Sequence, residues 1–221
     1  MPQMDAKHEI HPAHPDYCRT LPIMPSAPLI VVSGPAGAGK TTVVEKLLEH
    51  CKHLPLRRAV TATTREKRPG EEDGRSYHFW TVEQFRQAKD EGRMLETEIV
   101  HGRDYYGTPR DEVDRYRSKG TGVILVIDVK GAASIRNLYP SDHLSVFIDA
   151  PFEELESRLR ARGAESEDRI QQRLDTARRE KERSREFDRT IVNSDLDRAV
   201  ADLERLVQSQ FMRQQYPTLR D

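Results

Sequence analysis

A stretch of small and cationic residues near residue 40 has the composition of a phosphate-binding loop. It fits the pattern G-x-x-x-x-G-K-[ST], with Gly34, Gly39, Lys40 and Thr41 at the defining positions. A polyphosphate requires several converging backbone N–H groups, and residues with little or no Cβ let the chain approach closely enough to aim them. Lys40 would reach the outer phosphates as a point charge, and the Thr41 hydroxyl would hold Mg²⁺. The predicted nucleotide site comprises Gly34, Pro35, Ala36, Gly37, Ala38, Gly39, Lys40, Thr41 and Thr42.

The segments on both sides of the loop provide the context that such a site requires. Leu29–Ser33 is a short continuous apolar run, which is typical of a strand buried on both faces. Helical spacing follows at Val43, Val44, Leu47 and Leu48. The loop should therefore open a helix, to about residue 51, whose N-terminal dipole faces the phosphates. The alternative, a glycine-rich turn with a surface lysine, is disfavoured by this context.

The remaining chain alternates predicted strands and helices, which favours a parallel α/β sheet. Strands are expected over residues 58–64, 77–80, 94–100, 123–128, 144–148 and 190–193, with a turn at 102–108. Helices are expected over 81–92, 109–119, 132–138, 151–162 and 196–212, together with an arginine-rich helical stretch from 169 to 179. Thr81 and Gln84 form a predicted capping box. Asp128 ends an apolar strand, at the edge where ligands of open α/β sheets bind.

Length and composition limit the class of protein. A chain of 221 residues suits one α/β domain with insertions, and its net charge of −1 provides no overall field that would favour nucleic acid or membrane. Cys18 and Cys51 show neither metal spacing nor a disulfide framework, which suits a reducing cytosol. No apolar run is long enough to span a membrane, and residues 1–27 lack a signal-peptide apolar region. We therefore expect a soluble cytoplasmic protein.

The N-terminal residues 1–27 are polar and rich in proline, and they carry His8, His11 and His14 at intervals of three. One interpretation is a weak metal-binding tract. A disordered extension, which cannot bury enough apolar area to fold, is favoured over it. Met24 lies just before the first strand, so translation starting there is a further hypothesis. Residues 213–221 are expected to form a C-terminal tail.

The loop, a basic segment after it and the Tyr-Tyr-Gly-Thr turn together resemble the guanylate kinase family, whose members phosphorylate GMP with ATP. The resemblance covers about residues 29–206 and rests on ordered motifs: residues 60–65 with Arg68, Gly70 and Glu71, then Tyr77, Glu96, Tyr106, Gly107, Thr108 and Asp128. It implies a P-loop NTPase-type parallel sheet flanked by helices, with a core at 28–60 and 109–212. It also implies an inserted mixed α+β subdomain that binds the nucleoside monophosphate at about 61–108, and a helical lid at about 162–186.

The resemblance also implies which residues bind GMP. The phosphate would be held by Arg65, Arg68, Tyr77 and Tyr106, because guanidinium forks pair with phosphate oxygens. Guanine would be selected by Thr61, Glu96, Thr108 and Asp128, because an acceptor-only carboxylate meets its N1–H and N2 donors and a threonine hydroxyl donates to O6. Gly107 also belongs to the GMP-binding residues that the resemblance implies. AMP should then be a poor acceptor, by a factor of about 10⁴ or more. The alternatives are a solvated charged loop, ordinary packing of the tyrosines, and an exposed strand carboxylate at position 96.

On the ATP side, Arg162, Arg173 and Asn193 resemble the lid and the segment that frames the adenine. Lys40, Arg65 and Arg173, with Mg²⁺ bound alongside ATP, would neutralise charge during an in-line transfer without a covalent intermediate. The competing interpretation is a helix covered with solvated arginines and glutamates. That interpretation is preferred for Arg178, Arg179, Arg183 and Arg185.

Three features depart from many relatives. Val126 stands where an acid is common, which removes any water contact toward magnesium that the acid would make, and Lys130 stands where glutamine is common. The turn His101–Asp104 is one residue longer, which leaves Glu98 as an alternative to Glu96. A sugar-phosphate kinase would not need the guanine-reading set, and non-catalytic guanylate-kinase-like modules typically lack an intact loop. A nucleic-acid binder is disfavoured by the balanced charge.

Overall fold

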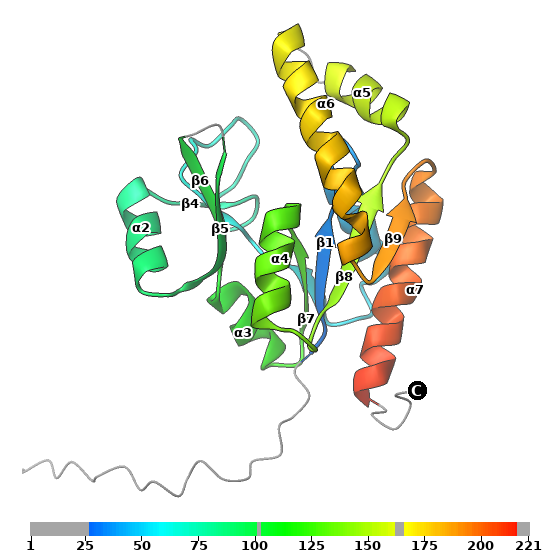
Figure 1. Cartoon of the computed structure of the whole chain (residues 1–221). Coiled ribbons are helices and arrows are strands. Elements are labelled where there is room, and N and C mark those ends of the chain that lie inside the picture. Colours follow the sequence, from blue (N-terminus) through cyan, green and yellow to red (C-terminus); the bar gives the residue numbers. More distant parts are fainter. Residues whose placement is uncertain (1–26, 101–102, 162–165, 216–221) are drawn as a thin grey trace, which may run out of the picture.

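The computed structural model describes residues 27–100, 103–161 and 166–215. In these ranges the chain forms two separate sheets (Figure 1). The central sheet has the strand order β2-β7-β1-β8-β9, and all of its pairings are parallel. Its strands are β1 (Leu29–Ser33), β2 (Leu56–Arg58), β7 (Gly122–Val126), β8 (Leu144–Asp149) and β9 (Arg189–Val192). The predicted parallel sheet is confirmed.

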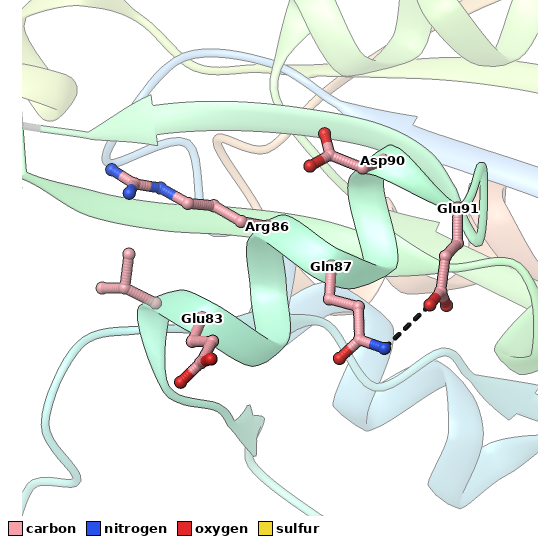
Figure 2. A pocket seen from close by; sticks show the side chains of 6 residues that line it. Glu83, Arg86, Gln87, Asp90 and Glu91 are labelled. Atoms are coloured by element: carbon pink, nitrogen blue, oxygen red, sulfur yellow. Dashed lines mark hydrogen bonds between the residues drawn. The ribbon is translucent and has the colours of Figure 1, made fainter.

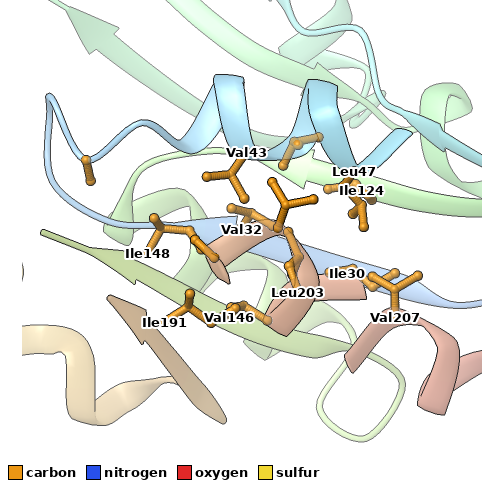
Figure 3. Packing of buried hydrophobic residues seen from close by; sticks show 14 of the residues in the cluster. Ile30, Val32, Val43, Leu47, Ile124, Val146, Ile148, Ile191, Leu203 and Val207 are labelled. Atoms are coloured by element: carbon orange, nitrogen blue, oxygen red, sulfur yellow. The ribbon is translucent and has the colours of Figure 1, made fainter. Parts of the chain in front are cut away.

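Helices cover both faces of the central sheet, which explains why its strands are apolar runs. The helices are α1 (Lys40–His50), α3 (Asp111–Arg117), α4 (Val129–Leu138), α5 (Phe152–Ala161), α6 (Glu167–Glu182) and α7 (Leu196–Gln215). A 3₁₀ turn at Arg183–Glu186 directly follows α6. Along β1, Ile30 and Val32 pack with α1 and α7, as Figure 3 shows. Leu29 and Val31 pack on the opposite face with α3 and α4. Each such fully buried aliphatic side chain contributes about 1.5–3 kcal/mol.

The second sheet lies to the left of the central sheet in Figure 1 and has the strand order β4-β3-β6-β5. It contains β3 (Ala62–Thr63), β4 (His78–Phe79), β5 (Met94–Val100) and β6 (Asp104–Pro109), and α2 (Val82–Asp90) packs on it. The pairing of β3 with β4 is parallel, whereas β6 is antiparallel to both β3 and β5. Thr81 and Gln84 form the predicted capping box of α2, which is thereby confirmed.

Three predicted elements were wrong in detail. Of the strand expected over 58–64, only Arg58 belongs to β2 and only Ala62–Thr63 form β3, because the chain leaves the central sheet between them and enters the second sheet. The turn expected at 102–108 is mostly the strand β6, because β3 and β5 supply pairing partners on both sides. The helix expected from 132 begins at Val129, because the Asp128 side chain accepts a hydrogen bond from the Gly131 N–H and caps it.

Several expectations concern parts of the chain outside the described residues: those for residues 1–26, for Arg162 and for residues 216–221. Within the described residues, no helix is long and apolar enough to cross a membrane. Cys51 is a free, buried thiol directly after α1.

Candidate active site

The predicted phosphate loop connects β1 to α1 at the carboxyl end of the central strand. Gly37 and Gly39 have φ values of 88° and 84°, which side chains with a Cβ rarely adopt. A Cβ on Gly39 would lie 2.4 Å from Asn193 Nδ2. A Cβ on Gly34 would lie 2.0 Å from the Ile148 carbonyl oxygen. These glycines are therefore required by the backbone conformation and by the close approach of β8 and the segment after β9.

Polar side chains hold the loop in this shape. Lys40 Nζ donates to the carbonyl oxygens of Gly34 and Pro35, at 2.6 and 3.0 Å. Asn193 is buried directly after β9 and donates from Nδ2 to the Ala38 carbonyl oxygen at 2.7 Å. Thr41 lies exposed in the first turn of α1. The structure thus brings Lys40, Thr41 and Asn193 together at one loop.

Two residues that the sequence analysis did not single out also contact the loop. Arg158 of α5 donates to the Gly37 carbonyl oxygen at 3.3 Å and to the Asn193 carbonyl oxygen at 3.1 Å. Burial raises the pKa of the Glu180 carboxyl on α6, and the Lys40 charge and the Ala36 backbone N–H partly offset this effect. For Arg158, the available signal was its position one helical turn before Arg162.

The helix α6 is fastened to the same end of the central sheet. Lys181 donates to the Ala150 carbonyl oxygen at 2.7 Å and forms an ion pair with Asp149 at 2.7 Å. Arg173 lies half-buried on this helix, two turns before Lys181. The anchor at Lys181 therefore sets where α6 passes over the phosphate loop.

A buried carboxylate and a buried hydroxyl face each other in the second sheet. Glu96 of β5 is paired in register with Thr108 of β6, and Thr108 Oγ1 donates to Glu96 Oε1 at 2.7 Å. Burial raises the pKa of Glu96 to about 7, the hydrogen bond from Thr108 opposes this shift, and the nearby charge of Asp128 adds to it. A Cβ on Gly131 would lie 3.2 Å from Glu96 Oε2 and 3.3 Å from Asp128 Oδ1. Both carboxylates therefore converge on the start of α4.

The second acidic residue of β5 has a different environment. Glu98 forms an ion pair with Lys130 of α4 at 3.0 Å, and the lysine side chain is 70% exposed. This contact links the second sheet to α4 on the surface. It distinguishes Glu98 from the buried Glu96, which is 9% exposed.

A second group of side chains in this region, the Arg65 cluster, surrounds Arg65, which follows β3 in the chain. Arg65 Nε donates to the Tyr106 hydroxyl at 3.1 Å, and its two terminal nitrogens donate to the two carboxylate oxygens of Glu71 at 3.0 and 2.7 Å. The bond to Glu71 is the main reason that the pKa of Arg65 is raised. The rings of Tyr77 and Tyr106 meet edge to face with centroids 5.9 Å apart, and burial raises the pKa of Tyr77. Arg65 is thus a fixed, permanently charged fork.

Three further predicted residues lie near these groups in different ways. Thr61 is half-buried in the connection before β3, where its carbonyl oxygen accepts from the His78 N–H at 2.9 Å. Arg68 is exposed, and only its backbone is held, by a 2.8 Å bond to Glu71. Gly107 is required by packing, because a Cβ there would lie 2.6 Å from the Glu96 carbonyl oxygen.

An open cavity of about 660 Å³ lies elsewhere, on the solvent side of α2 (Figure 2). It is lined by Val82, Glu83, Arg86, Gln87, Asp90 and Glu91. None of the predicted site residues lines this cavity, so it is separate from the phosphate loop, from the Glu96–Thr108 pair and from the cluster around Arg65.

Comparison with known proteins identifies the family. The guanylate kinase family model matches residues 26–210. The chain belongs to the guanylate kinase family. It is 45% identical over 186 residues to the guanylate kinase of Aromatoleum aromaticum, covering 84% of this chain and 89% of that protein. It is 42% identical over 178 residues to that of Salinibacter ruber, covering 80% and 93%. The structure of guanylate kinase from Anaplasma phagocytophilum superimposes with a TM-score of 0.69 at 30% identity, covering 85% of this chain and 87% of that one.

Membership of the guanylate kinase family confirms three of the predictions made from the sequence. The chain has the P-loop NTPase-type fold, it is a kinase, and its reaction is phosphorylation of GMP by ATP. The substrates ATP and GMP follow at the level of the family.

Proposed function

We propose that the chain transfers the γ-phosphoryl group of ATP to GMP between the phosphate loop and the second sheet. The observation that carries the assignment of this site is the buried pair Glu96 and Thr108 beside Asp128. An acceptor-only carboxylate matches the N1–H and N2 amino group of guanine. The Thr108 hydroxyl, whose single proton is donated to Glu96 in the free chain, would turn to donate to guanine O6. dGMP presents the same base edge, so we expect it to be an acceptor as well.

The loop at residues 34–42 would hold the phosphates of ATP. Its positive-φ glycines aim backbone N–H groups at one point, and the start of α1 adds a favourable dipole. Lys40 exchanges its contacts with the loop carbonyl oxygens for phosphate oxygens. Asn193 and Arg158 keep the loop in shape. In the lid at about 162–186, Arg162 would lie near the adenine, and Arg173 would neutralise the charge that spreads during transfer.

Mg²⁺ bound with ATP is the cofactor that the family implies, and the residues present fit it. The exposed Thr41 hydroxyl is a hard oxygen ligand, and Mg²⁺ usually retains several waters while taking phosphate oxygens. No group of three or more His, Cys, Asp or Glu in the described ranges could hold a metal alone, so the ion would arrive with ATP. When bound, it neutralises negative charge on the phosphates. Val126 supplies no oxygen to it.

The Arg65 cluster would hold the phosphate of GMP. Glu71 and Tyr106 fix the plane of the Arg65 guanidinium, and Tyr77 and Arg68 add hydrogen-bond donors. The GMP phosphate oxygen then attacks the γ-phosphoryl group in line, so no protein nucleophile is required. Orientation and charge neutralisation provide the rate. Closure of the insertion at about 61–108 and of the lid excludes water.

An acceptor panel tests this proposal. ADP release is measured with Mg·ATP and either GMP, AMP, CMP or UMP. Strong turnover with GMP and almost none with AMP is the expected result. Measurable ATP binding without turnover of any of the four would favour a sugar-phosphate kinase or a non-catalytic module instead. We also propose a cytoplasmic location, which the free thiol of Cys51 supports.

A further inference from the structure

Within the described residues, the chain passes between the two sheets at two short connections. It leaves β2 at Arg58 and enters β3 at Ala62, and it returns from β6, which ends at Pro109, to α3, which begins at Asp111. When two packed units rotate against each other, a few such connecting residues absorb the change in φ and ψ. Any change in the angle between the sheets therefore acts on these two connections.

One carboxylate follows the second connection in the chain and is hydrogen-bonded to the first. Glu112 lies on α3 directly after the second connection, and its Oε2 accepts from the Val60 N–H of the first connection at 2.9 Å. The same oxygen accepts from Arg57 Nη1 of β2 at 2.8 Å. Its Oε1 lies 3.2 Å from His78 Nε2 of β4. A single side chain thus joins the central sheet, the second sheet and both chain crossings.

The surroundings keep this carboxylate fixed and charged. The Glu112 side chain is 13% exposed. Burial alone would raise its pKa, but the hydrogen bonds from His78, Val60 and Arg57 outweigh burial and lower the pKa to about 2. Arg57 is itself held, because its guanidinium lies 3.7 Å above the ring of Tyr116 and donates to the Glu112 carbonyl oxygen at 3.3 Å. Several charge-assisted bonds at one buried group make a rigid junction.

We propose that Glu112 is a positioning residue for phosphoryl transfer, the pivot that sets the orientation of the second sheet relative to the phosphate loop. The inference rests on the placement of GMP at the second sheet. The loop and the Glu96–Thr108 pair belong to different sheets, whereas the reacting atoms must come within about 3–3.5 Å of each other. A small angular error at the pivot is magnified at the reacting atoms. Misplacement by about 1 Å can cost about 10²-fold in rate.

The test is E112Q, which keeps the shape of the side chain and removes its charge. We expect kcat/KM for GMP to fall at least about tenfold, because the second sheet is no longer held at the productive angle. The dissociation constant of Mg·ATP, measured by direct titration, should stay within about twofold, because the loop belongs to the central sheet. H78N, which removes the ring nitrogen that contacts Glu112 together with the ring that stacks on Trp80, should lower kcat/KM in the same direction, and it serves as a second variant if E112Q folds poorly.

A matched control is D188N. Asp188 is also a carboxylate that accepts from a backbone N–H and a side chain, Ser145 N and Oγ, both at 2.7 Å, but it joins β8 to the start of β9 and not the two sheets. D188N should lower the thermal midpoint without changing kcat/KM for GMP. Equal kinetic behaviour of E112Q and D188N, or a parallel loss of ATP and GMP affinity in E112Q, would overturn the pivot.

The only tryptophan of the chain provides a spectroscopic readout. Trp80 stacks on His78, with ring centroids 6.3 Å apart and planes at 27°. Trp80 emission should therefore change in E112Q but not in D188N. H78N is left out of this readout because it removes the stacking ring itself. Unchanged emission in E112Q would contradict the proposal. If the wild-type chain did not phosphorylate GMP, both the activity and this inference would be refuted. If the wild type turned over GMP and E112Q had the same kcat/KM for GMP, only the role of Glu112 would be refuted.

Discussion

Replacing Glu96 with glutamine should stabilise the free protein at alkaline pH while it removes GMP turnover. The folded state raises the pKa of Glu96 from 4.5 to about 7, chiefly by burial. A raised folded-state pKa means that the folded chain retains a proton which the unfolded chain releases. The stability gained from this proton is complete below pH 4.5 and is lost as pH rises through 7.

The size of this effect follows from the shift. The difference between a pKa of 4.5 and a pKa of about 7 corresponds to about 3 kcal/mol, of which about 2 kcal/mol is lost between pH 5.5 and pH 8.5. Relative to the wild type, E96Q should therefore gain about 2 kcal/mol between these two pH values. For a chain of this length that is a relative rise of about 4–8 °C in the thermal midpoint.

The assay is thermal unfolding of both proteins at pH 5.5 and pH 8.5, together with GMP kinetics at pH 8.5. E96Q should lose about 10²-fold in kcat/KM for GMP, because an amide cannot accept from both guanine donors. E98Q is the matched control, since Glu98 lies two residues further along β5 and forms a surface pair with Lys130. Parallel pH dependence of the E96Q and wild-type midpoints would refute the argument from burial.

Three further predictions concern the phosphate loop and Glu96. K40M should lower transfer by at least about 10²-fold while the fold stays intact, because it removes one charge at the phosphates. Wild-type turnover in a coupled ADP assay would contradict the role of the loop. The KM for GMP should rise as pH falls below about 7, since only ionised Glu96 accepts from both guanine donors. Initial rates at several GMP concentrations and pH values give the KM at each pH, and a KM that does not change with pH would contradict this prediction. G39A should cost about 1–3 kcal/mol in chemical denaturation, because its Cβ would enter the space of Asn193 at a φ of 84°; a stability equal to the wild type would exclude this strain.

Local signals in the sequence were sufficient for the loop and its flanking elements. The glycine pattern, the apolar run Leu29–Ser33 and the capping box at Thr81 each depend on residues close in the chain, and the structure confirms the strand and the capping box. The ordered motifs after the loop identified the family, which the comparisons confirm. The roles of the individual site residues remain proposals.

Long-range pairing decided what the sequence could not. Val60 and the threonines predicted one strand over 58–64. Pairing with two different neighbours, β7 at Arg58 and β6 at residues 62–63, instead assigns its two ends to β2 and β3. Residues 104–109 contain a glycine and read as a turn, but β3 and β5 on either side satisfy their backbone groups as a strand. Strand assignment in such segments depends on partners that are distant in the sequence.

The chemistry of the site shows the same division. From residue type and spacing, the sequence by itself predicted a phosphate loop. Through the resemblance to the family it also predicted guanine-binding and phosphate-binding residues, whose roles remain proposals. Only the tertiary structure decided that Glu96 is buried against Thr108 while Glu98 pairs at the surface, that Arg158 reaches the loop, and that Glu112 joins both chain crossings. The physical reason is that burial, and with it the pKa and hydrogen-bond partners of a charged group, is a property of the packed neighbours and not of the local sequence.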